Sequence, residues 1–272
     1  MKKIVMILLA LMLLMSSALA EEKAVGRLAM VGLDEQSVLE KAQSTGLRAS
    51  DQKVNAFLSV AELNRNIFYD NLMTMLLALN ADEITEIGIG LHTAQYIVAR
   101  NDSLAYEESA IPLTDTFCMM VMDSNQDIYD LINNAIIELK ADGTLDALIA
   151  GELSIESDPL PVEMPEFKGS RTIRVAVTGD LPPMDFATAD GTPAGFNVAL
   201  LSEIANRTQM NIELVQVDSA ARSTALATGR VDAIFWSKAY LFNGVVAMAE
   251  ELSGGLLTEG YFAEPYARVF KK

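Results

Sequence analysis

The sequence predicts an α/β fold of two lobes, and two similar segments far apart in the chain carry that prediction. Residues 78–87 and 225–234 each read as a helix that ends on Ala-Leu, turns through polar or small residues, and continues as a short apolar strand. A helix that runs into a strand in this way is the second half of a βαβ unit. Because this device occurs once in each half, we expect two lobes, each a mostly parallel sheet flanked by helices, with a small ligand held between them.

The elements of the first half follow from the spacing of apolar residues. A strand is predicted at 67–69, and a second one at 84–89. Between them, Leu72, Met75, Leu76 and Leu79 lie on one helix face. Another helix is predicted where Ile128, Leu131, Ile132, Ala135, Ile136 and Leu139 recur at helical spacing, with a stop at 141–143. Residues 24–60 show no clean period and are not assigned.

The second half predicts the order β-α-β-α-β. Strands are expected at 173–177, 212–217 and 231–236, with helices carrying Phe196, Leu200, Ile204 and Ala205 on one face and spanning 221–228. That order is typical of a mostly parallel sheet. Between the halves, Pro159, Pro161 and Pro165 interrupt the periodicity. We therefore expect a signal peptide at 1–20, one lobe at 21–158, a linker at 159–170 and a second lobe at 171–272.

The first twenty residues predict export. Lys2 and Lys3 precede an apolar run of about a dozen residues, too short for a membrane-spanning helix, and the segment ends at a small-x-small site at Ala20. Cleavage after Ala20 would release a secreted or periplasmic protein. Position 21 is Glu, so no lipid-modifiable cysteine follows the cleavage site, and we expect no lipid anchor. The single cysteine, Cys118, excludes an internal disulfide and is expected to be buried.

The charge balance argues against one class of partner. The chain carries 20 basic and 37 acidic residues, a net charge of −17. Nucleic acid is a polyanion, so it is an improbable partner for this surface. The acidity supports solubility and says nothing of the fold.

A series of motifs in the second half resembles a known family. They are Ile173-Arg174-Val175-Ala176-Val177, Leu181-Pro182-Pro183-Met184-Asp185-Phe186, Asp190-Gly191, Gly195-Phe196-Asn197-Val198 and Gly229-Arg230-Val231-Asp232-Ala233-Ile234. In this order and spacing, they resemble the N-terminal lobe of the bacterial extracellular solute-binding proteins of the polar amino-acid type, family 3. The resemblance implies a type II periplasmic-binding-protein-like fold, a small polar ligand and an ABC-transporter permease as partner.

The first half resembles the other lobe of the same family, so the lobe order is inverted. Residues 68–98 look like the family's C-terminal lobe, and residues 135–148 look like its closing helix. The simplest hypothesis is a circularly permuted binding protein, because compact domains tolerate relocated termini. A tandem ancestor that lost half of each copy is the competing hypothesis.

The resemblance directs attention to the loop 180–186 and to the end of the third strand. In the family, the loop walls the cleft, which implies ligand contacts for Asp180, Met184 and Phe186. An ordinary core position is an equal alternative for Phe186. Trp236 and Ser237 are expected at a strand end, where open α/β sheets bind ligands, although Trp236 equally suits a core. Asp232 is expected to hold backbone groups.

Two departures from the family put its usual ligand in doubt. The family's amino-acid binders place an arginine after the third strand, but residues 237–244 contain none, and Lys238 offers only a point charge. The carboxylate that the family places at the end of a strand in its other lobe aligns with Gly90. Either the pocket has been rebuilt or amino-acid binding has been lost.

Other chemistries find little support. His92 is the only histidine, no Gly-x-Ser-x-Gly elbow is present, and no Cys/His cluster or Gly-rich loop suggests a metal or nucleotide. We therefore expect no catalytic residues, metal or cofactor. The expected function is an extracytoplasmic solute-binding protein of an ABC-type importer. The alternative is a sensor or scaffold module on the same fold that has lost amino-acid binding, and an enzyme such as a dehydratase rests on fold analogy alone.

Overall fold

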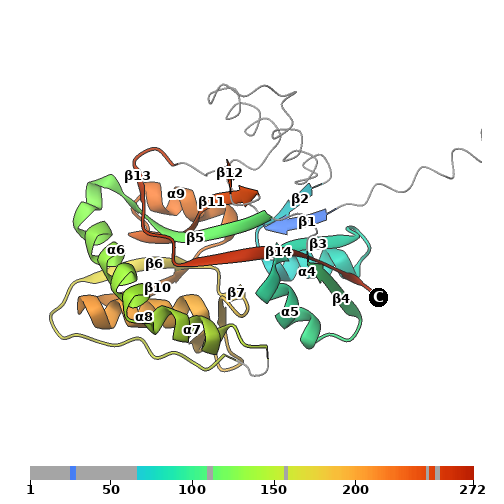
Figure 1. Ribbon diagram of the computed structural model, residues 1–272, viewed down its shortest axis with the longest axis horizontal. Helices are drawn as coiled ribbons and strands as arrows, with labels where there is room; N and C mark the ends of the chain where they lie inside the picture. Colours follow the sequence, from blue (N-terminus) through green and yellow to red (C-terminus); the bar gives the residue numbers. More distant parts are fainter. Residues whose placement is uncertain (1–24, 29–65, 109–112, 156–158, 243–244, 249–251) are drawn as a thin grey trace, which may run out of the picture.

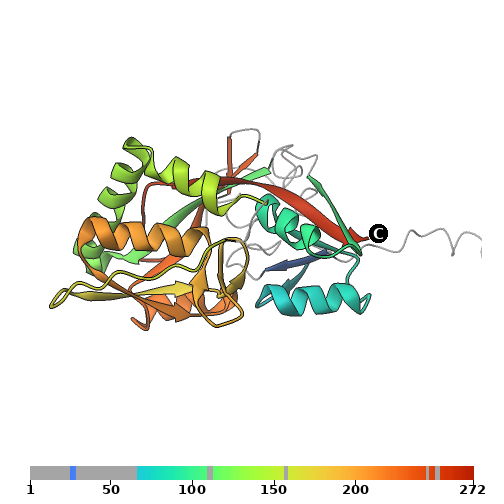
Figure 2. The same ribbon diagram turned by 90° about the horizontal axis from the view of Figure 1, so that it is seen from below.

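The computed structural model describes residues 25–28, 66–108, 113–155, 159–242, 245–248 and 252–272. These residues form a mixed α/β structure of two bodies joined by long strands (Figure 1 and, turned by 90°, Figure 2). The predicted α/β class is therefore confirmed. Most of the unassigned stretch 24–60 and the predicted signal peptide lie outside the described residues. Within the described residues, no helix has both the length and the apolar character needed to cross a bilayer.

The first body has a five-stranded sheet in the order β2-β1-β3-β14-β4. Its strands are β1 (Val25–Leu28), β2 (Asn66–Tyr69), β3 (Glu86–Gly90), β4 (Leu104–Glu108) and β14 (Phe262–Lys271). Both β2 and β3 run parallel to β1, whereas β14 is antiparallel to β3 and to β4. The crossover helix α4 (Leu72–Asn80) joins β2 to β3, and α5 (Leu91–Ala99) follows β3 directly. This is the βαβ unit that the sequence predicts.

Helix α4 forms where its sequence supplies both a cap and an apolar face. The side chain of Asn71 accepts a hydrogen bond from the backbone N–H of Thr74 at 3.0 Å, which satisfies one of the free donors of the first turn. Leu72, Met75 and Leu79 are buried, as their spacing predicts. They pack with residues of β3, α5 and β14 in the core of the first body.

The second body has a sheet whose order is β10-β6-β11-β5, with β13 beside β5. Its strands are β5 (Leu113–Met122), β6 (Thr172–Val177), β10 (Asn211–Gln216), β11 (Ala233–Phe242) and β13 (Gly255–Leu257), and β12 (Val245–Met248) pairs with β11. The strands β10, β6 and β11 are parallel, as predicted, and β5 is antiparallel to β11. A small sheet of β7 (Asp180–Leu181), β8 (Asp185–Ala187) and β9 (Pro193–Ala194) follows β6.

Helices cover both faces of this sheet. Residues Val175 and Met119 lie in a core with α6 (Gln126–Ala141), α7 (Thr144–Glu152) and α8 (Phe196–Thr208). The residues beside them on the same strands, Ala176 and Cys118, lie in the other core with α9 (Arg222–Ala227). This alternation is the two-residue period of strands buried on both faces. Cys118 is fully buried, as expected, and its sulfur is not part of a disulfide.

Two ten-residue strands connect the bodies. Strand β5 leads from the first body into α6 of the second, and β14 leads back (Figure 1). The first four residues of β14 pair with β5, and the residues from Tyr266 on pair with β3. Each sheet thus has three parallel strands followed by a long antiparallel strand, and the long strands also pair with each other.

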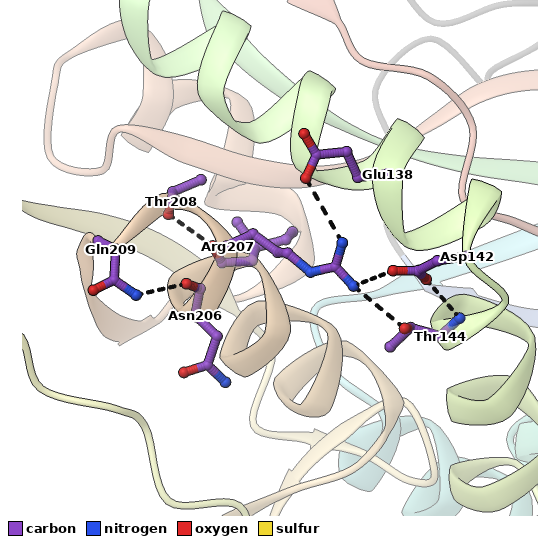
Figure 3. Close-up of polar contacts among 8 residues, drawn as sticks. Glu138, Asp142, Thr144, Asn206, Arg207, Thr208 and Gln209 are labelled. Carbon is purple, nitrogen blue, oxygen red and sulfur yellow. Dashed lines mark hydrogen bonds and ion pairs between the residues drawn. The ribbon is translucent and has the colours of Figure 1, made fainter.

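The helices before the linker pack on the residues after it. Figure 3 shows the guanidinium of Arg207, at the end of α8, directed at Glu138, Asp142 and Thr144 around the α6–α7 turn. The hydrogen bonds from Thr144 and then from Arg207 lower the pKa of Asp142 to about 2. The linker predicted at 159–170 stays a prediction. The helices α6 and α7, which precede it in the chain, pack against α8, which follows it, so the two bodies do not coincide with the two halves of the sequence.

One strand is longer than predicted. The sequence places the end of the third strand at Trp236, but β11 continues to Phe242. The extension is stable because Ala239 to Phe242 pair with Thr116 to Leu113 of β5, and β12 pairs on the other side. These partners lie far away in the sequence, so local periodicity does not reveal them.

Candidate functional site

The two bodies touch where the parallel strands of both sheets end. We call this region the junction and define it by Asp70 and Met73, after β2, and by Asp180 and Ser219, after β6 and β10. The backbone N–H of Ser219 donates to the carbonyl oxygen of Asp70 at 3.2 Å, and that of Met73 donates to Asp180 Oδ2 at 3.4 Å. Open α/β sheets bind their ligands outside the carboxyl ends of the strands. The junction is therefore the candidate site.

Asp180 is the predicted site residue that the structure places at the junction. Its carboxylate lies at the N-terminus of α4, where free backbone N–H groups stabilise negative charge. Burial raises the pKa of Asp180 above its usual range, and the neighbouring carboxylates of Asp185 and Asp218 raise the pKa further. The hydrogen bonds from the backbone of Met73 and Leu72 oppose this effect. Burial and the two carboxylates thus outweigh the two hydrogen bonds, and the described contacts only partly stabilise a negative charge on Asp180.

A buried aspartate that the sequence analysis missed shapes the loop before this site. Asp185 accepts hydrogen bonds from the backbone N–H of Thr178 at 2.6 Å, that of Gly179 at 3.0 Å and the side-chain amide of Asn197 at 2.8 Å. The hydroxyl of Thr178 is a fourth donor. These hydrogen bonds connect the loop to α8. The hydroxyl of Tyr261 in turn donates to Asn197 Oδ1 at 3.3 Å. The peptide bond between Pro182 and Pro183 is cis.

The two apolar residues predicted for the loop have different surroundings. Met184 is 3% exposed and belongs to the core of the second body. Phe186, on β8, is partly buried, and its ring lies 6.1 Å from that of Tyr96 on α5 of the first body. Leu181, in the same loop, contacts the cores of both bodies. Phe186 therefore lies between the bodies, whereas Met184 supports the loop from within.

The remaining predicted site residues lie on β11. Trp236 pairs with Cys118 and Ser237 with Phe117 of β5, and the register shifts between Ser237 and Ala239, at Lys238. They are therefore within a strand and not at its end. Asp232, just before β11, accepts hydrogen bonds from the backbone N–H of Arg174 at 2.8 Å and from its guanidinium. This confirms the predicted backbone-holding role of Asp232.

A carboxylate from the long strand β14 fills the position beside Gly90. A Cβ atom on Gly90 would lie 2.4 Å from Glu264 Oε2 and 2.7 Å from Oε1. Glu264 is 2% exposed, and its Oε1 accepts a hydrogen bond from the backbone N–H of His92 at 2.8 Å and lies 3.1 Å from His92 Nδ1. His92 thus has a structural role at the start of α5. The carboxylate missing from position 90 of the sequence has a spatial counterpart in Glu264.

Ser219 is the second functional candidate that sequence reasoning missed. It is 5% exposed, and its hydroxyl oxygen is buried without a hydrogen-bond partner among the described residues. A buried polar group in this state is costly, and nearly all such groups in folded proteins are paired. The residue follows Asp218 and contacts Asp70 through its backbone, which places it at the junction. Nothing in the local sequence distinguishes it from a turn serine.

Basic and metal-binding groups are scarce at the junction. Within the described ranges, no ion pair involves Asp70, Asp180 or Asp218. Arg222 is the nearest basic residue along the chain from Ser219, and its Nη1 donates to the carbonyl oxygen of Phe235 at 3.4 Å. No group of three or more His, Cys, Asp or Glu in the described part of the chain is arranged to hold a metal ion.

Comparison with solved structures gives distant similarities. The ligand-binding component of an ABC-type import system from Staphylococcus aureus, with zinc bound, has 9% identity and a TM-score of 0.42, over 92% of this chain and 65% of that one. A putative L-cystine ABC transporter from Listeria monocytogenes has 11% identity and a TM-score of 0.39, over 92% of this chain and 82% of that one. The reduced OxyR regulatory domain from Pseudomonas aeruginosa has 8% identity and a TM-score of 0.36, over 92% of this chain and 88% of that one. TM-scores at this level do not assign a function.

Comparison with family models gives a local match. No curated protein sequence matches the chain. The matched segment is one quarter of the chain, and it contains all six residues that the sequence analysis proposed for ligand contact, from Asp180 to Lys238. It also contains Ser219 and Asp185. Residues 173–239 match the family of the bacterial extracellular solute-binding proteins, family 3.

Proposed function

We propose that the protein is an extracytoplasmic solute-binding protein that holds a small polar ligand at the junction and delivers it to an ABC-type importer. The observation that carries the proposal is that the residues meeting at the junction from the second body lie within the family match at 173–239. The predicted signal peptide, cleaved after Ala20, would bring the chain to that location. We expect no enzymatic activity, because the family matched at 173–239 is one of solute-binding proteins.

The proposal includes a permuted order of lobes. The match to the family's N-terminal lobe lies in the second half of the chain, and both sheets have the order of three parallel strands and one long antiparallel strand. The two bodies are similar, and each is connected to the other by one long strand, β5 or β14. This arrangement is compatible with either order of the lobes along the chain. Permutation therefore explains the inverted resemblance without any change in packing.

Ligand contact is proposed for Asp180, Phe186, Trp236, Ser237 and Lys238. The position of Asp180 and Phe186 between the bodies supports their inclusion. Met184 was expected to join them, but its burial favours a role in holding the loop. Closure of the two bodies around the ligand would take place through the strands β5 and β14, which are the described connections between them.

Thermal unfolding of residues 21–272 with a panel of amino acids, small organic acids, amines and short peptides tests this function. A ligand present at 100-fold over its Kd adds about 2.7 kcal/mol to the free energy of unfolding, which raises the melting temperature measurably. The Asp180→Ala variant should lose the rise, and Asp146→Ala, altered at an exposed position on α7, should keep it. A rise that is equal in both variants would contradict a site at the junction.

A second candidate is a sensor or scaffold module that binds no solute. It is favoured by the direct contacts between the bodies and by Glu264, which occupies the space beside Gly90 and the N–H of His92. Groups that are already satisfied within the protein are less available to a ligand. Small-angle scattering that stays unchanged across the same ligand panel, with no shift in melting temperature, would support this second candidate.

A further inference from the structure

We propose that the junction selects a small organic ammonium ion, held by the carboxylate of Asp180 and by the hydroxyl of Ser219. This inference rests on the proposed function and names the chemical class of its ligand. It starts from the charges at the junction. Asp180 and Asp218 on the second body lie near Asp70 on the first, and no described basic side chain pairs with any of them.

Around Asp180, only the backbone N–H groups of Met73 and Leu72 offset a negative charge, and no described basic side chain does. The neighbouring charges that act on its pKa are both carboxylates, those of Asp185 and Asp218, and both raise that pKa. Asp185 is satisfied by its own donors in the loop, so it does not compete for a ligand. Arg222 directs its guanidinium to the carbonyl oxygen of Phe235. A cation placed beside Asp180 would therefore relieve repulsion instead of adding to it.

The unpaired hydroxyl of Ser219 is an independent sign that the junction receives a ligand. Its oxygen is buried and has no partner among the described residues, although the backbone N–H of the same residue bonds to Asp70 across the junction. A hydroxyl oxygen accepts through two lone pairs, and an ammonium group carries N–H donors that need acceptors. One ammonium can satisfy the hydroxyl of Ser219 and pair with the carboxylate of Asp180.

The same features disfavour other ligand classes. A metal ion needs several convergent ligands, and no described group of three or more His, Cys, Asp or Glu side chains provides them. A carboxylate would approach three aspartates without a basic partner, which costs free energy at short range. The overall charge of −17 further favours the approach of cations, because long-range attraction raises their local concentration.

Four molecules with the same four-carbon chain test the proposal: butylamine, 1,4-diaminobutane, 4-aminobutyrate and succinate. Calorimetric titration of residues 21–272 at physiological salt would screen non-specific attraction to an acidic surface. We expect the two amines to bind, 4-aminobutyrate to bind more weakly, and succinate not to bind. Tighter binding of 4-aminobutyrate or succinate than of butylamine would overturn the ammonium preference while leaving a solute-binding function in place.

Two variants locate the binding. Ser219→Ala removes one acceptor and should weaken butylamine binding about tenfold, the ratio expected for one hydrogen bond. The unliganded variant should unfold at the same or a higher temperature, because an unpaired buried hydroxyl is removed. Asp180→Asn should weaken binding at least as much, and the matched control Asp146→Asn should not. Binding of the amines that is unchanged in Ser219→Ala would overturn the proposed site, and absence of binding by all four molecules would overturn both the preference and its assignment to the junction.

Discussion

At the scale of single residues, Asp185 is the group on which the candidate site depends most. It is 3% exposed, and three of its donors are backbone or amide N–H groups of the loop and of α8. Asp185→Ala would leave these donors buried without an acceptor. We expect the free energy of unfolding to fall by about 3 kcal/mol, because removing one side of a buried charged network leaves its partners unsatisfied. Urea denaturation would measure this loss.

An exposed aspartate in the same part of the chain provides the control. Asp190 accepts hydrogen bonds from the hydroxyl of Thr188 and from the backbone N–H of Thr192, but it lies in an exposed turn. Asp190→Ala should lower the free energy of unfolding by less than about 1 kcal/mol, as is usual for surface changes. Equal losses in the two variants would show that burial of Asp185 does not decide its contribution.

At the scale of secondary structure, the contact of β3 and α5 with β14 depends on the missing side chain of Gly90. In Gly90→Ala, the new methyl group would overlap the carboxylate of Glu264 and displace it from the N–H of His92. We expect a loss of about 2 kcal/mol for Gly90→Ala, from overpacking, and a similar loss for Glu264→Ala, from the unpaired N–H. The double variant should recover at least about 1 kcal/mol of the sum, because each change removes the other's conflict.

Gly151 provides the control glycine for the double-mutant cycle of Gly90 and Glu264. It lies on the helix α7, and a Cβ there meets no atom within 4 Å. Gly151→Ala should therefore stabilise the protein by up to about 1 kcal/mol, since alanine loses less backbone entropy in a helix. Strictly additive losses for Gly90→Ala and Glu264→Ala would mean that the two side chains do not share one space.

The elements that the sequence predicts are those whose signals are local. Helix α6 and strands β6 and β10 appear where apolar periodicity and turn residues place them, and α4 buries the face that its spacing marks. The extension of β11 beyond Trp236 was not predicted, because β5 holds it from more than a hundred residues away. For the same reason the sequence did not identify Glu264 or Ser219, whose importance comes from contacts with His92 and Asp70 on another element.

The predicted site shows the same limit. Asp180 was named because the family resemblance pointed to the loop 180–186, and its contact with α4 follows from how the two bodies meet. Met184 has the same local setting but points into the core. Whether a loop residue faces the core or the other body depends on the pairing of distant strands, which one sequence does not reveal.

At the scale of the whole molecule, the strand register makes the permuted order testable. Val25 of β1 and Phe270 of β14 both pair with Glu86, on opposite sides of β3. Two strand spacings separate them, about 10 Å, at the edge where β14 ends and β1 begins. A flexible Gly/Ser linker of about six residues spans such a distance. The family's order of lobes could thus be restored in a chain that runs from 159 to 272, through this linker, and then from 25 to 155.

We expect this reordered chain to fold to the same structure, since every strand pairing and all three cores remain available. Its free energy of unfolding should lie within about 2 kcal/mol of the parent's, as is common when new ends are placed in exposed connections. Its response to the ligand panel should be unchanged. A control chain opened between Cys118 and Met119, which are both fully buried in β5, should fail to fold cooperatively, because it cuts a strand between two cores. If the reordered chain were unfolded like this control, the order of the lobes would itself be required for folding, and simple permutation of a family ancestor would be the wrong history for this fold.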